Sequence, residues 1–188
     1  MDIKLSNFIS EGQILSGEQA SIFLRTFKDN VFEDALIGIG ENSKIDKNVR
    51  NVTQYSLHRN EKSMTEMYWV NYLLYKINHL RTKYINFHSL ENAEKVECIN
   101  ILKYEVGGKY VPHVDSSNHL DTRMYSIIIF LNNDYKGGRL QFIYKDQTLE
   151  IEPYPGKAVI WPSNLLFKHG VTPVTEGTRY TMVSWINS

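Results

Sequence analysis

Hydrophobic positions in the first half of the chain recur at the three- and four-residue spacing of amphipathic helices. A capping-box pattern, Ser16 with Gln19, precedes an apolar stripe that predicts a helix over 17–29. A second pattern, Ser63 with Glu66, precedes a stripe that predicts a helix over 63–81. We assign both stripes to the core and expect the helices to pack against the outer face of one sheet.

The second half of the chain changes to short apolar runs that are separated by turn residues such as Pro155-Gly156. The predicted strands are 97–104, 125–132, 139–144, 148–152, 157–162, 165–169 and 178–186, with a further strand near 35–39. Many short strands of this kind favour a jelly-roll or cupin-like double sheet. The predicted fold class is therefore mainly β with helical support (α+β), built on a double-stranded β-helix core.

Residues 40–60 show little hydrophobic pattern and are predicted to form a long loop. A loop of this length in a compact domain is usually functional or disordered. Two interpretations stay open: a lid over a substrate, or a solvated connection on the surface.

A chain of 188 residues is long enough for one domain with its own core. We expect a single domain over 1–188, with helical support and a lid region in 1–95 and the jelly-roll core in 96–188. The 21 basic residues balance the 21 acidic ones, which disfavours nucleic acid as a partner. No apolar stretch approaches the roughly 20 residues of a membrane helix. The single cysteine, Cys98, excludes an intramolecular disulfide, and with no recognisable signal peptide it predicts a cytoplasmic location.

Three residues in the second half form a candidate metal site. His113 and Asp115 stand as His-x-Asp, and His169 follows far along the chain. Residues i and i+2 share a face of a strand, so both side chains of the pair can reach one point. Two imidazoles and one carboxylate typically hold Fe(II) on one face and leave its other positions open. His-x-Asp alone is a weak signal, and its context decides how much it means.

That context is an ordered series of short motifs. It comprises 104–115 (YEVGGKYVPHVD), Arg123, 126–132 (SIIIFLN), 137–142 (GGRLQF), 158–162 (AVIWP), 169–171 (HGV), Arg179 and Trp185. Taken together, the series resembles the catalytic domain of the prolyl 4-hydroxylase branch of the Fe(II)- and 2-oxoglutarate-dependent dioxygenases. The resemblance covers about residues 96–186 well and the N-terminal half loosely.

The resemblance implies an oxygenase that uses Fe(II), with 2-oxoglutarate and O2 as co-substrates and ascorbate as an optional auxiliary. It gives His113, Asp115 and His169 the role of iron ligands. Arg179 would pair with the distal carboxylate of 2-oxoglutarate, a task that suits the planar fork of arginine. Tyr104 would donate a hydrogen bond to the co-substrate, and Tyr110 and Trp185 would line the pocket. For Tyr110 and Trp185, plain packing in the core is the alternative.

Two positions depart from the pattern of many relatives. Phe130 stands where they have tyrosine, so it lacks a hydroxyl that would reach the co-substrate. Arg139 follows the paired glycines where many have an acidic residue. Arg50, Arg123 and Arg139 could contact a substrate at the rim, or could be solvated surface charges.

Three hypotheses on function follow. The first is hydroxylation of prolyl residues in a peptide or protein, which would enter under the 40–60 loop. The second is the same chemistry on a free amino acid, another small molecule or a nucleobase. The third is a non-enzymatic jelly-roll binding module, which the presence of all three candidate ligands and Arg179 disfavours. Substrate choice depends on rim loops that one sequence does not decode.

Overall fold

The structure is a computed structural model that describes residues 4–38, 43–57, 63–90, 93, 95–116 and 122–188. Its helical elements are η1 (Leu5–Asn7), α1 (Gly17–Phe27) and α2 (Met64–His88). Its strands are β1 (Ser10–Gln13), β2 (Glu33–Asp34), β3 (Arg50–Asn51), β4 (Thr53–Leu57), β5 (Lys95–Val96), β6 (Ile99–Tyr104), β7 (Lys109–His113), β8 (Arg123–Phe130), β9 (Lys136–Gly137), β10 (Leu140–Tyr144), β11 (Gln147–Ile151), β12 (Lys157–Pro162), β13 (His169–Val171), β14 (Val174–Glu176) and β15 (Arg179–Asn187).

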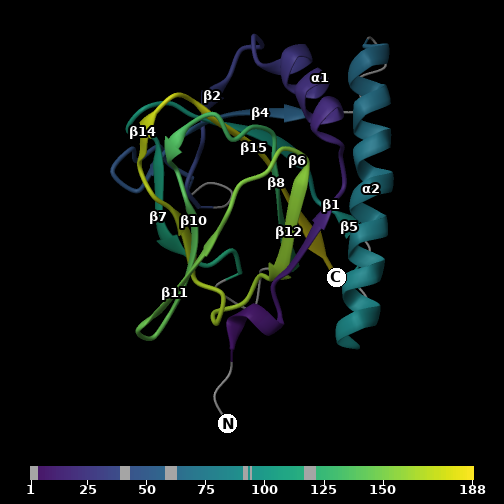
Figure 1. Cartoon of the computed structure of the whole chain (residues 1–188), viewed down its shortest axis with the longest axis vertical. Helices are drawn as coiled ribbons and strands as arrows, with labels where there is room; N and C mark the ends of the chain where they lie inside the picture. The colour runs from purple at the N-terminus through teal and green to yellow at the C-terminus, as the bar shows by residue number, and fades with distance from the viewer. Residues whose placement is uncertain (1–3, 39–42, 58–62, 91–92, 94, 117–121) are drawn as a thin grey trace.

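In the described part of the chain, these strands form two main antiparallel sheets that face each other. The larger sheet has the order β1-β12-β8-β15-β6-β4-β2, and β5 pairs with β15 beside it. The smaller sheet has the order β11-β10-β13-β7-β3, and β14 pairs with β9 separately. Figure 1 shows the small sheet on one side of the molecule and α2 running along the opposite side. The predicted jelly-roll core with helical support is confirmed.

Both predicted helices form at their predicted N-termini. The Gln19 backbone N–H donates to Ser16 Oγ at 3.1 Å and the Ser16 backbone N–H donates to Gln19 Oε1 at 2.9 Å, which completes the capping box. At α2, the Glu66 backbone N–H donates to Ser63 Oγ at 3.2 Å. Helix α2 runs to His88, beyond the predicted end at 81, because Tyr84 and Ile85 continue its buried stripe. It ends at Ser89, which has the left-handed conformation (φ 52°).

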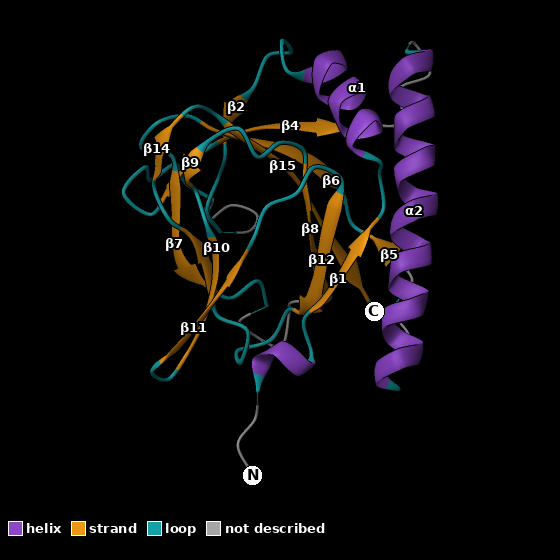
Figure 2. Cartoon of the chain, viewed as in Figure 1, coloured by secondary structure: helices purple, strands orange, loops and turns teal. Residues whose placement is uncertain are grey.

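The hydrophobic core has two layers. The outer layer lies between the helices and the large sheet, where Phe23 and Leu73 belong to the same buried cluster as the strand residues Ile127 and Ile129. Figure 2 shows both helices on this one side of the sheet. The inner layer lies between the two sheets and includes Ile128. Strand β8 is apolar without interruption from 127 to 130 because alternate side chains enter the two layers, so both of its faces are buried.

Two predictions in the N-terminal half were wrong. No strand forms over 35–38: β2 ends at Asp34, only an isolated bridge joins Ile37 to Lys44, and Gly38 turns the chain with φ 90°, while residue 39 lies outside the described part. The loop predicted over 40–60 contains β3 and β4; its residues 40–42 and 58–60 lie outside the described part. Strand β4 lacks a strong apolar pattern because its side chains are mostly half-buried, and pairing with β6 determines its conformation.

The strand predicted at 165–169 was also wrong, because the chain turns there before β13 begins at His169. The Leu166 backbone N–H donates to Asn164 Oδ1 at 3.1 Å, a turn that asparagine favours. Leu165 is 76% exposed, so this apolar run does not contribute a strand to the core. None of the helices in the described residues is long and apolar enough to span a bilayer.

Candidate active site

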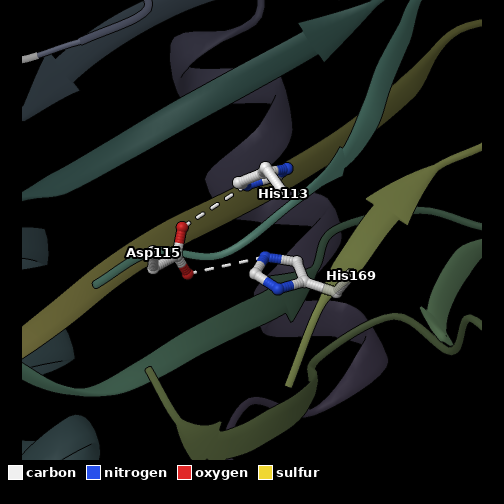
Figure 3. A group of neighbouring side chains, drawn as sticks. All are labelled: His113, Asp115 and His169. Atoms are coloured by element: carbon white, nitrogen blue, oxygen red, sulfur yellow. Dashed lines mark ion pairs between the residues drawn. The ribbon is translucent and has the colours of Figure 1, made fainter. Parts of the chain in front are cut away.

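Pairing of two strands in the small sheet brings the candidate metal ligands together. His113 is the last residue of β7, and Asp115 follows two positions later. His169 is the first residue of β13, which pairs antiparallel with β7 so that His169 lies opposite His113. Figure 3 shows the Asp115 carboxylate on one side of the two imidazoles, with one ion pair to each ring.

The three side chains offer their ligand atoms to one small volume. His113 Nε2 lies 3.4 Å from Asp115 Oδ1, and His169 Nε2 lies 3.5 Å from Asp115 Oδ2. One donor atom from each residue lies within 4.8 Å of the others. Spacing of this kind suits a single metal ion, because three atoms at about 2.0–2.2 Å from one centre lie a few ångströms apart.

The other nitrogen of each imidazole determines which nitrogen can bind metal. His113 Nδ1 lies 3.0 Å from the Val111 carbonyl oxygen, and His169 Nδ1 lies 3.0 Å from the Phe167 carbonyl oxygen. A carbonyl only accepts hydrogen bonds, so Nδ1 carries the proton in both rings. In the neutral imidazole, Nε2 then presents a lone pair to the centre. The residues therefore fit a divalent metal such as Fe(II).

Electrostatics favour the same protonation states. Burial alone would raise the pKa of the Asp115 carboxyl, but His169, His113 and Ser126 together outweigh it and hold this pKa below its ordinary value. Burial lowers the pKa of His169 to about 4, against an opposing influence of Asp115. At neutral pH the site thus holds an ionised carboxylate and, at His169, a neutral imidazole, the forms that bind metal.

A buried pair of serines supports the carboxylate, and the sequence analysis did not identify it. Ser126 Oγ donates to Asp115 Oδ2 at 2.6 Å and lies 2.7 Å from Ser163 Oγ. Both serines are essentially inaccessible to solvent. Ser126 directly precedes the apolar run 127–130 of β8, and a polar residue inside a strand that is buried on both faces is the signal that could have revealed it.

The candidate ligands line a cavity of about 330 Å³, a size typical of small-ligand sites. Tyr104, Tyr110 and Trp185, which the resemblance placed at the co-substrate, line the same cavity. The Tyr110 ring stacks on the His113 ring, with centroids 3.6 Å apart, so it limits the motion of that imidazole.

Arginines and the N-terminal segment complete the wall of the cavity. Arg50 lies over the Tyr110 ring, and Arg123 lies over the Trp185 ring while it pairs with Glu97. Leu36, Ile37 and Gly38 also line the cavity. Arg139 does not: it pairs with Glu152 on the exposed surface, which favours the surface-charge interpretation for this residue.

Arg179 lies next to the cavity and is fully buried. It begins β15 opposite Tyr104 of β6, and its guanidinium carbon lies 4.7 Å from the Tyr104 ring centroid. Its Nη1 donates to Thr181 Oγ1 at 3.2 Å, whereas Nε and Nη2 have no hydrogen-bond partner among the described residues. Burying a cation without a counter-charge costs free energy, so an anionic ligand at this guanidinium would be stabilising.

Comparisons with known proteins agree with this geometry. Residues 99–187 match the model of the 2OG-Fe(II) oxygenase superfamily. A PKHD-type hydroxylase of Synechococcus sp. (strain JA-2-3B'a(2-13)) is 27% identical over 184 residues, which cover 94% of this chain and 76% of the relative.

Two solved structures share the fold. A Pseudomonas putida prolyl-4-hydroxylase superposes with a TM-score of 0.73 at 20% identity, over 97% of this chain and 94% of that one. The second is a Trichoplax adhaerens prolyl hydroxylase in complex with a peptide fragment of the hypoxia inducible factor oxygen degradation domain. It superposes with a TM-score of 0.77 at 18% identity, over 97% of this chain and 84% of that one. The match to the 2OG-Fe(II) oxygenase superfamily covers residues 99–187, a stretch that contains the three candidate ligands and Arg179; the chain has a prolyl 4-hydroxylase-like fold and is a dioxygenase that uses Fe(II), 2-oxoglutarate and O2.

Proposed function

We propose that this dioxygenase hydroxylates prolyl residues in a peptide or flexible protein segment, as a single domain over 1–188. His113, Asp115 and His169 hold the iron, and Arg179 anchors 2-oxoglutarate. The observation that carries the assignment of roles is a cavity in which two Nε2 lone pairs and one carboxylate converge, and whose wall residue Tyr104 packs against the buried Arg179 guanidinium, which has no counter-charge among the described residues. The predicted cytoplasmic location stays a prediction.

The polar atoms around the cavity support an acidic co-substrate. Nε and Nη2 of Arg179, together with Nε1 of Trp161 and of Trp185, are buried nitrogen donors with no partner among the described residues. Both tryptophans line the cavity. Since 2-oxoglutarate offers only acceptor oxygens, it complements this set of donors, which would otherwise remain unsatisfied at a cost of about 1–3 kcal/mol each.

The chain's own residues hold and orient the reacting groups. When bound, iron supplies the O2 activation that couples decarboxylation of 2-oxoglutarate to succinate with hydroxylation of a substrate C–H bond. The carbonyls of Val111 and Phe167 keep both imidazoles in the tautomer that binds metal. Ser126 holds one oxygen of Asp115 and so fixes the orientation of the carboxylate.

The support for a prolyl substrate comes from relatives and from the rim of the cavity. The Synechococcus relative is called a PKHD-type hydroxylase, and both structural neighbours are called prolyl hydroxylases, one of them bound to a peptide. In this chain, Ile37, Gly38 and Arg50 form one wall of the cavity, so an extended peptide could lie against the N-terminal segment. Proline-rich segments adopt an extended polyproline II conformation with little loss of entropy on binding.

The test of the substrate class is turnover on a panel of proline-containing peptides and free proline, with Fe(II) and 2-oxoglutarate. Mass spectrometry should find one added oxygen on proline in a peptide, and the same peptide with alanine in place of proline should remain unmodified. Peptide binding should also slow amide exchange within 43–57. Oxygen found only on free amino acids, other small molecules or nucleobases would replace the prolyl proposal with the second hypothesis.

A separate prediction concerns the serine support of Asp115. Ser126→Ala should weaken metal binding by about 10–100-fold, the effect typical of hydrogen-bond partners of metal ligands. Titration with Co(II) or Mn(II) under anaerobic conditions measures this affinity without turnover. Ser184→Ala is the matched control, because Ser184 is an equally buried serine of the same sheet that donates instead to the Cys98 carbonyl. Equal metal affinities in the two variants would contradict the role of Ser126.

A further inference from the structure

A second polar side chain near Arg179 has an unsatisfied hydroxyl. Tyr135 lies in the connection between β8 and β9 and is half-buried. Its Oη is inaccessible to solvent, and its only hydrogen-bonding neighbour among the described residues is the Arg179 side chain, which can donate to the oxygen but cannot accept the hydroxyl proton. Burial raises the pKa of Tyr135, so the hydroxyl keeps its proton, and the charge of Arg179 is the largest opposing influence. A buried O–H donor without an acceptor is destabilising, and so is a buried guanidinium such as Arg179, which has no counter-charge among the described residues.

Gly138 shows how close the side chains of Tyr135 and Arg179 lie. A Cβ at this glycine would be 2.9 Å from Arg179 Cδ and 3.2 Å from Tyr135 Cε2. Its φ of +58° is also a conformation that favours glycine. The Gly137-Gly138 turn therefore lets both side chains pack over the same point of the backbone, and any larger residue at 138 would displace one of them.

The unpartnered atoms of Arg179 have a specific geometry. Nε and Nη2 are neighbours on one edge of the guanidinium, so their two N–H bonds form a fork that fits one carboxylate. Nη1, the remaining nitrogen, is already held by Thr181. A carboxylate held by the fork has lone pairs left for a third donor. Phe130, whose ring centroid lies 5.6 Å from the guanidinium carbon, has no hydroxyl to supply it.

We propose that Tyr135 supplies this third donor: its hydroxyl hydrogen-bonds the distal carboxylate of 2-oxoglutarate while Arg179 holds the same carboxylate by its fork. This inference rests on the proposed role of Arg179 and extends it to a residue that the sequence motifs did not include. One carboxylate then satisfies these three donors, two nitrogens of Arg179 and the hydroxyl of Tyr135. The hydroxyl absent at Phe130 is supplied by Tyr135, five positions further along the chain.

The test compares two ligands that differ only in the distal carboxylate. The binding of 2-oxoglutarate and of 2-oxobutyrate, which ends in a methyl group, is measured by calorimetry on the full chain loaded with Mn(II), so that no turnover is involved. Tyr135→Phe should weaken the binding of 2-oxoglutarate by about tenfold or more, which is the loss of affinity expected for a hydrogen bond to a charged group. The same substitution should leave the affinity for 2-oxobutyrate unchanged. Tyr154→Phe, at an exposed tyrosine, is the matched control and should change the affinity for neither ligand.

A double-mutant cycle separates this contact from a structural effect. In an Arg179→Met background, Tyr135→Phe should reduce the affinity for 2-oxoglutarate much less, since the carboxylate is no longer fixed beside the hydroxyl. The role of Tyr135 would be overturned if Tyr135→Phe weakened the binding of both ligands equally, or of neither. The anchor role of Arg179 would still stand in that case, provided that Arg179→Met weakens the binding of 2-oxoglutarate. If wild-type protein binds 2-oxoglutarate no better than 2-oxobutyrate, the proposed anchor itself fails, and the two failures are thus distinguishable.

Discussion

Replacement of His169 by alanine is expected to abolish 2-oxoglutarate turnover, with a loss of well over 100-fold. The loss should exceed the roughly 10–100-fold effect of partners that only orient a ligand, because a direct metal ligand disappears. His169 is 4% exposed and contributes one of three donor atoms, so no neighbouring water or side chain can readily replace it. Succinate formation and Fe(II) stoichiometry are the measurements.

Two controls separate loss of metal from loss of fold. His79→Ala, at an exposed histidine of α2, should retain full activity. His169→Gln keeps more of the buried volume and should also be inactive. Removal of metal with a chelator should silence the wild-type enzyme, and addition of Fe(II), but not Zn(II), should restore it. Normal iron stoichiometry and activity in His169→Ala would refute the assignment of His113, Asp115 and His169.

Replacement of Arg179 by alanine is expected to raise the 2-oxoglutarate concentration needed for turnover by about 30-fold or more. This corresponds to the 2 kcal/mol or more that is lost when one partner of a buried charge pair is removed. Binding of Fe(II) should change little, because Arg179 does not contact the candidate ligands. Arg179→Lys should restore binding only in part, because an ammonium offers a point charge in place of a fork.

The ligand-free protein provides an independent measurement of the same residue. Arg179 has no counter-charge among the described residues, so its burial should destabilise the free protein. Arg179→Met should leave the melting temperature unchanged or raise it, and should remove most of the stabilisation that 2-oxoglutarate gives to the metal-loaded wild type. A marked drop in melting temperature together with an unchanged 2-oxoglutarate requirement would assign Arg179 to the structural core instead of the co-substrate.

The sequence determined the features that depend on local order. Capping residues and apolar stripes located both helix starts, because these signals act within one or two turns. Short apolar runs between turn residues indicated the double sheet and most strands of the second half. His113, Asp115, His169 and Arg179 stood out because their residue types and their order along the chain indicate one chemistry.

Other features were decided by contacts between distant segments. Strand β4 forms through its pairing with β6 and had no clear local signal, whereas Tyr84 and Ile85 extend the stripe of α2, and their burial in the core cluster makes the helix continue to His88. Ser126 and Tyr135 resemble an ordinary strand serine and an ordinary turn tyrosine in the sequence. Only the fold places one against Asp115 and the other beside Arg179. Burial then makes every hydrogen bond at these positions matter, because a polar group removed from water must find its partner within the protein or its ligand.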